Sequence, residues 1–136
     1  MGRWMFLASL ALLYSSSLLA QVKPEWKPII GTWEGESICT VPDSPCHDEQ
    51  ALYRIKPDKD DPDKIVAEGF KVVDKRPQFM GILSCKFAPE QQVLTCTGNT
   101  PKRDIWTFNV GDGTIDGTLT IGKEKHLYRK ISLKKK

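Results

Sequence analysis

Long hydrophobic stretches are scarce in this sequence. Its 136 residues contain one extended apolar run, Trp4–Tyr14, whose 11 residues are too few to span a bilayer. A run of this length after the positive start Met1-Gly2-Arg3 is typical of a secretory signal peptide. We therefore expect cleavage after Ala20, or alternatively after Ser17, and an exported, periplasmic or secreted protein that has no transmembrane segment after leader removal.

Catalytic and metal-binding motifs are missing as well. The sequence has no Gly-x-Ser-x-Gly elbow, no phosphate-binding loop and no His-Glu-x-x-His, and its histidines are His47 and His126. The aspartates of residues 58–63 lack the central glycine and the distal glutamate of an EF-hand loop, so a solvated turn is expected there. His47-Asp48-Glu49 does not converge on one face if the segment is extended. We expect no enzyme activity, no cofactor and no metal site.

A large excess of one charge is also lacking. The chain has 20 basic and 17 acidic residues, and its net charge of +3 does not suggest a nucleic-acid partner. The charges are unevenly placed, because residues 21–74 are net acidic and residues 75–136 are net basic. A hydrophobic share of 40% and a charged share of 27% are ordinary for a folded domain and argue against disorder. The length suits one domain with one core.

All four cysteines lie after the leader, and an even number in a small exported domain predicts two disulfides. Three connectivities are possible, and we favour Cys39–Cys46, which closes a short loop, together with Cys85–Cys96. The second pair follows from a hairpin turn at Glu90-Gln91, which would place Cys85 and Cys96 directly opposite each other on one face. The competing zinc site is disfavoured because no Cys-x-x-Cys pair is present.

Short β-rich runs separated by turn residues recur after Pro28, and no ten-residue stretch has a helical apolar period. We predict an all-β fold, an eight-stranded antiparallel up-and-down barrel, with a compact sandwich as the alternative. The predicted strands are Ile30–Cys39, Gln50–Lys56, Lys64–Asp74, Gln78–Ala88, Gln92–Gly98, Asp104–Val110, Thr114–Ile121 and Lys125–Leu133.

Gly31-Thr32-Trp33 opens the first predicted strand, and Arg129 has an inward position on the last one. This combination resembles the calycin superfamily, and the wider pattern around Cys39 and Cys46 looks like small exported bacterial lipocalin-like proteins of unknown function. The resemblance implies a lipocalin- or avidin-like barrel in which Arg129 packs over Trp33 at the closed end. With the leader and the strand pattern, this divides the chain into a signal peptide (1–20), a lead-in segment (21–29), a lipocalin-like barrel (30–133) and a basic tail (134–136).

Strand alternation places several aromatic and apolar side chains inside the barrel, where Gly35, Gly81 and Gly117 are expected to leave space. We therefore expect a non-enzymatic protein that binds a small apolar or amphipathic molecule with its head group near the mouth of the barrel. A net basic rim is expected at this mouth, and it would favour an anionic head group or an acidic partner surface. Its basic residues are Lys75, Arg76, Lys102, Arg103, Lys123 and Lys125, and Asp48, Glu49 and Asp74 oppose them. A filled barrel is the structural alternative. The functional alternative is a protein-interaction module, such as an inhibitor of an exported hydrolase, which would act through its loops or through residues 21–28 and would have a filled interior. The expected ligand contacts are Tyr53, Phe79, Leu83, Trp106 and Phe108.

Overall fold

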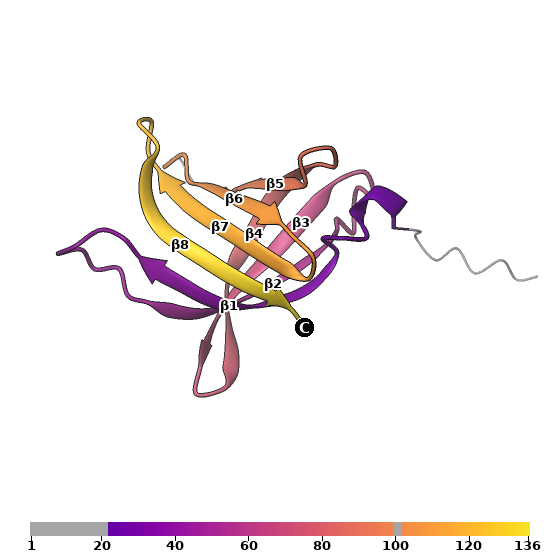
Figure 1. Cartoon of the computed structure of the whole chain (residues 1–136). Helices are drawn as coiled ribbons and strands as arrows, with labels where there is room; N and C mark the ends of the chain where they lie inside the picture. Colours follow the sequence, from indigo (N-terminus) through magenta and orange to yellow (C-terminus); the bar gives the residue numbers. More distant parts are fainter. Residues whose placement is uncertain (1–21, 100–101) are drawn as a thin grey trace, which may run out of the picture.

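Eight β-strands in chain order form one closed antiparallel barrel, so the predicted fold class is confirmed. The computed structural model describes residues 22–99 and 102–136, and the predicted signal peptide lies outside them (Figure 1). A short 3₁₀ helix, η1, precedes the strands. The elements are η1 (Pro24–Trp26), β1 (Gly31–Cys39), β2 (Glu49–Pro57), β3 (Ile65–Val73), β4 (Arg76–Ala88), β5 (Val93–Thr97), β6 (Ile105–Val110), β7 (Thr114–Ile121) and β8 (His126–Lys135).

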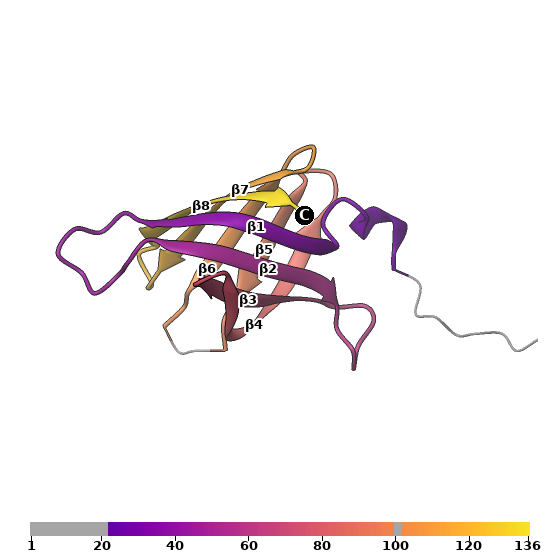
Figure 2. The same cartoon turned by 90° about the horizontal axis from the view of Figure 1, so that it is seen from below.

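The barrel closes where β1 pairs with β8, a seam that Figure 2 shows from outside. The paired residues run from Trp33 opposite Lys135 to Cys39 opposite Arg129. The backbone N–H of Lys136 donates to the carbonyl of Thr32 at 2.9 Å. Residues 134–136, expected to form a basic tail, therefore belong to the seam.

Both predicted disulfides are present. Cys39 is joined to Cys46, and Cys85 to Cys96. Cys85 and Cys96 are directly paired across β4 and β5, with a Cα–Cα distance of 4.1 Å, as the hairpin register predicts. The predicted two-residue turn at Glu90-Gln91 is wrong, because the last strand pair is Ala88–Val93 and residues 89–92 form a four-residue turn. Pro89 has no N–H to donate to the strand pairing, which explains why the ladder stops before it.

One half of the barrel is filled by its own side chains. Trp33 and Phe108 are fully buried there, and Trp26 and Ile29 of the N-terminal segment belong to the same core. The indole Nε1 of Trp33 donates to the carbonyl of Ile29 at 2.9 Å. Together these contacts close the end of the barrel at which β1 begins.

Two glycines expected to leave space are instead places of close packing. A Cβ added at Gly35 would lie 1.9 Å from the backbone oxygen of Ser132, because β1 and β8 approach closely there. A Cβ added at Gly117 would lie 2.8 Å from the Phe108 ring. The expectation that Gly35 and Gly117 open the interior is therefore wrong, since neighbouring atoms already occupy that volume.

Candidate functional site

The other half of the barrel contains a cavity of about 440 Å³. Its wall combines apolar side chains from β2, β4, β6 and β7 with polar groups from β1, β2 and β8. Three of the five expected ligand contacts line it. They are Tyr53, Leu83 and Trp106.

Glycines make room for this cavity. A Cβ added at Gly69 would be in ordinary contact with the Tyr53 ring at 3.5 Å, and one added at Gly81 would meet no atom within 4 Å. A Cβ at Gly98 would lie 3.5 Å from the Trp106 ring. All three glycines line the cavity, so the expected role of Gly81 as a space-leaving residue fits the structure.

Phe108 lies within the filled core and is fully buried. Its ring packs edge-on against Tyr53, with the ring centroids 5.3 Å apart. Phe108 was expected to contact a ligand, but it does not line this cavity and supports the cavity wall through Tyr53. Strand alternation correctly predicted that Phe108 faces inward, but Tyr53 lines the cavity and Phe108 does not.

Phe79 is 58% exposed, and its expected inward position is also wrong. The register of β3 and β4 shifts between Gly69 and Phe70, so that Gly69 pairs with Gly81 but Phe70 pairs with Phe79. Met80 is the extra residue in this β-bulge, and one extra residue reverses the face of every side chain beyond it. Phe79 instead packs against Phe70, with ring centroids 5.6 Å apart.

Arg129 is the central polar residue of the cavity. Its Nη1 donates to the backbone oxygen and the hydroxyl of Ser37, both at 3.3 Å, and to the carbonyl of His47 at 3.0 Å. Its Nη2 lies 3.6 Å from a carboxylate oxygen of Glu49. The guanidinium thus joins β8 to β1 and to the loop that follows β1. Its charge is balanced by Glu49, and both side chains border the cavity.

The expected contact of Arg129 with Trp33 is wrong. Antiparallel pairing puts Trp33 opposite Lys135, and Arg129 precedes Lys135 by six residues, or roughly 20 Å of strand. Arg129 therefore lies at the open end of the barrel, whereas Trp33 closes the other end. The inward face of Arg129 could be predicted from alternation, but the stagger between the first and last strands could not.

Tyr53 brings a phenol to the same site. Burial raises its pKa from 10.0 to about 12, although hydrogen bonding with Trp106 and the charge of Arg129 act in the opposite direction. Glu49 adds to the increase. The hydroxyl is therefore neutral at physiological pH and can donate a hydrogen bond into the cavity.

The loop between β1 and β2 is held at the open end of the barrel by Cys39–Cys46. The backbone N–H of Cys39 donates to a carboxylate oxygen of Asp48 at 2.8 Å. This loop supplies the His47 carbonyl that Arg129 binds. The disulfide therefore orders a segment that contributes to the polar side of the cavity.

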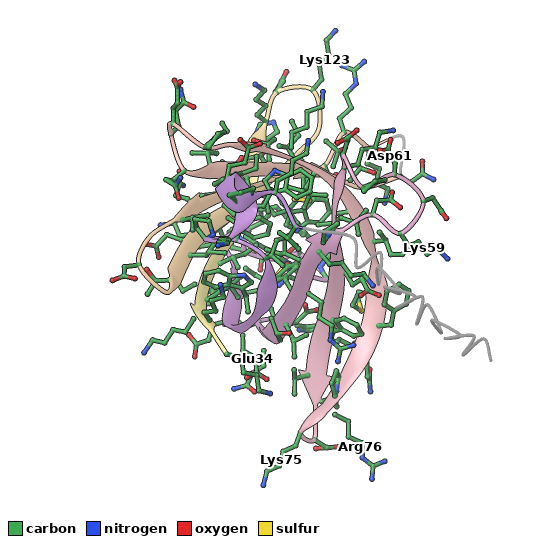
Figure 3. The ribbon with its side chains drawn as sticks, turned by 90° about the vertical axis from the view of Figure 1, so that its right-hand side faces the viewer. Glu34, Lys59, Asp61, Lys75, Arg76 and Lys123 are labelled. Atoms are coloured by element: carbon green, nitrogen blue, oxygen red, sulfur yellow. A yellow bond between two sulfur atoms is a disulfide. The ribbon has the colours of Figure 1, made fainter. Side chains whose placement is uncertain are left out.

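The expected basic rim does not form one patch. Figure 3 shows Lys123 at one extremity of the molecule and Lys75 with Arg76 at the opposite one. At the cavity itself the cation of Arg129 is paired with the carboxylate of Glu49. The sequence placed Glu49 among the acidic residues at the mouth, but it did not indicate that Glu49 would pair with Arg129.

Within residues 22–99 and 102–136, no group of three or more His, Cys, Asp or Glu side chains is arranged to hold a metal ion. Over the same residues, no helix has the length and apolar character needed to cross a membrane. Comparison with models of known protein families gives no match, and comparison with curated proteins gives none either.

Proposed function

We propose that this protein binds a small apolar or amphipathic molecule in the open half of its barrel and does not act as an enzyme. The observation that carries this proposal is the cavity of about 440 Å³, which falls in the size range of small-molecule sites. Leu83, Trp106 and Leu119 offer it an apolar surface. The closed half supplies a rigid base, because its core is filled.

The polar groups favour a ligand with a hydrogen-bonding head group. Arg129 can donate, Glu49 can accept, and the neutral hydroxyl of Tyr53 can do both. Since Arg129 and Glu49 compensate each other, a head group need not carry a full charge. A hydroxyl or carboxyl group at the end of an apolar body matches this arrangement.

We further propose that the barrel is lipocalin-like, related to the calycin superfamily, and exported. The buried Trp33 of Gly31-Thr32-Trp33, near the start of β1, supports the proposal of a lipocalin-like barrel. Lys135 provides the cation over the indole. Two disulfides in a small domain support export, because oxidising compartments allow them to persist.

The alternative, an inhibitor acting through a mobile N-terminal segment, is less well supported. Trp26 is 5% exposed and anchors the segment to the core, although the other described residues of 22–28 are exposed or half-buried. Deleting the segment would remove Trp26 from the core, so a loss of function would not distinguish the two functions. Cavity variants distinguish them better, because an inhibitor with a surface interface should be insensitive to them.

The first test is a comparison of native and denaturing mass spectra of the protein purified from an oxidising compartment. A retained ligand gives a discrete additional mass in the native spectrum alone. The protein is then incubated with 1-decanol or decanoate, which share an apolar body and differ in head-group charge. We expect a stoichiometric complex with at least one of them. A bare chain under all three conditions would contradict the proposal.

Variants locate the bound molecule. Trp106→Ala removes an aromatic wall and should weaken the complex about tenfold or more, since burying a large side chain contributes on the order of 1.5–3 kcal/mol. Gly69→Leu should place a side chain in the cavity and block binding. Ile38→Ala is the matched control, because Ile38 is 43% exposed and lies on β1 outside the cavity. Equal binding by all of these proteins would place the ligand elsewhere.

A further inference from the structure

The hairpin of β3 and β4 projects from the barrel wall (Figures 1 and 3). β5 pairs with residues 84–88 of β4, whereas residues 76–83 of β4 are paired with β3 alone among the described strands. The tip is a two-residue turn, Asp74-Lys75, with φ values of 50° and 64°. This hairpin therefore has a free edge and extends beyond the barrel.

Apolar side chains are concentrated on the hairpin. Four of the eight exposed large hydrophobic residues of the described chain lie on it. We refer to these four as the hairpin patch. They are Val73 (39% exposed), Phe79 (58%), Met80 (60%) and Ile82 (54%).

The free edge is poorly suited to pairing with another strand. Pro77 lacks the N–H that a ladder needs, and Met80 interrupts the ladder as a bulge. A partner strand would therefore find a broken row of backbone groups. The hairpin patch can contact a partner through its apolar side chains instead. Such contacts suit a surface that does not pair through backbone hydrogen bonds.

The charge around the patch favours an anionic surface. Residues 70–83 carry three cations and one carboxylate, Asp74. Figure 3 shows Lys75 and Arg76 at the projecting end of the hairpin. A second copy of this hairpin would bring like charges together, which disfavours self-association. The combination of exposed apolar side chains and nearby cations matches the boundary between acyl chains and anionic head groups.

We propose that the β3–β4 hairpin docks the protein on an anionic lipid surface. Phe79, Met80 and Ile82 enter the apolar boundary, and Lys75 and Arg76 contact the head groups. Met80 and Ile82 also line the cavity, so docking places the cavity opening beside the lipid. This last point rests on the proposed ligand-binding function, whereas docking itself does not.

The test is co-sedimentation of the purified protein with vesicles of phosphatidylcholine, with and without phosphatidylglycerol. We expect binding to the anionic vesicles that weakens as salt concentration increases. The variant Phe79→Ser/Met80→Ser/Ile82→Ser should lose at least tenfold in affinity, and so should Lys75→Glu/Arg76→Glu. The controls are Ile38→Ser/Leu127→Ser and Lys123→Glu/Lys125→Glu, which change exposed apolar and basic residues elsewhere.

Three results would overturn docking: no binding to either vesicle, equal binding to both, or equal losses in the controls. A concentration-dependent dimer that the triple serine variant abolishes would assign the patch to self-association instead. Circular dichroism and the free energy of unfolding verify that each variant is folded. The Lys75→Glu/Arg76→Glu protein should still bind decanol or decanoate, so failure of docking and failure of ligand binding remain distinguishable.

Discussion

The ammonium nitrogen of Lys135 lies 5.5 Å from the centre of the Trp33 ring. The same nitrogen donates to the carbonyl of Lys27 at 3.4 Å. Lys135 therefore connects β8 to β1 and to the N-terminal segment at the closed end of the barrel. A cation at the face of an indole is stabilised by the ring quadrupole.

Lys135→Met should lower the free energy of unfolding by about 1 kcal/mol, because it removes the cation while keeping much of the apolar stem. The measurement is urea denaturation followed by tryptophan fluorescence. Lys134→Met is the matched control, since Lys134 neighbours Lys135 on β8 and is exposed. Equal effects of the two substitutions would show that the contact with Trp33 contributes nothing specific.

Arg129→Met should destabilise the fold more strongly, by about 2–3 kcal/mol, because it leaves the acceptors of Ser37 and His47 without a charged donor. Arg129→Lys should restore only part of the loss, since an ammonium cannot reproduce the planar guanidinium. Chemical denaturation measures both effects. Full restoration by lysine would mean that charge, rather than geometry, is what this site requires.

Tyr53 should make the stability of the protein pH-dependent above pH 10. Its folded-state pKa is raised to about 12, so its contribution is fully present below pH 10 and is lost as the pH increases toward 12. The loss is on the order of 2–3 kcal/mol for a shift of this size. Tyr53→Phe should remove this part of the pH dependence. Unfolding measured at pH 9, 10 and 11 tests it, and an unchanged slope in the variant would contradict the assignment.

Lys75→Gly should stabilise the hairpin by about 1 kcal/mol, because Lys75 has a φ of 64° that glycine adopts without steric cost. Thermal or chemical unfolding measures the effect. The same substitution should weaken vesicle binding, since it removes one of the cations at the tip. A protein that is both more stable and less able to bind vesicles would indicate that this lysine is retained for its charge.

Local patterns were sufficient to predict the strands and the disulfides. A hairpin centred on Glu90-Gln91 placed Cys85 opposite Cys96, because register within a hairpin depends on a few neighbouring residues. Features that depend on one inserted residue or on distant strands were not predictable. The bulge at Met80 turned Phe79 outward, and the stagger of β1 against β8 separated Arg129 from Trp33.

The candidate site was predicted in part, because some of its residues follow from local patterns and others depend on distant strands. Tyr53, Leu83 and Trp106 lie on regular strand segments, so alternation identified them. Which glycines leave space depends on what packs opposite each one. Phe108 fills the volume beside Gly117, and no pattern within β7 indicates this.

The seam between β1 and β8 has a consequence for the order in which the chain folds. Arg129 and Ser37, which meet across it, are 92 residues apart in the sequence. Contacts of such separation form slowly, because a long segment must be ordered before they contribute. The adjacent hairpins can assemble first, while the free edge of β1 remains available for incorrect pairing until β8 arrives. Closure of the seam is therefore the step at which a chaperone that shields strand edges would help this protein most.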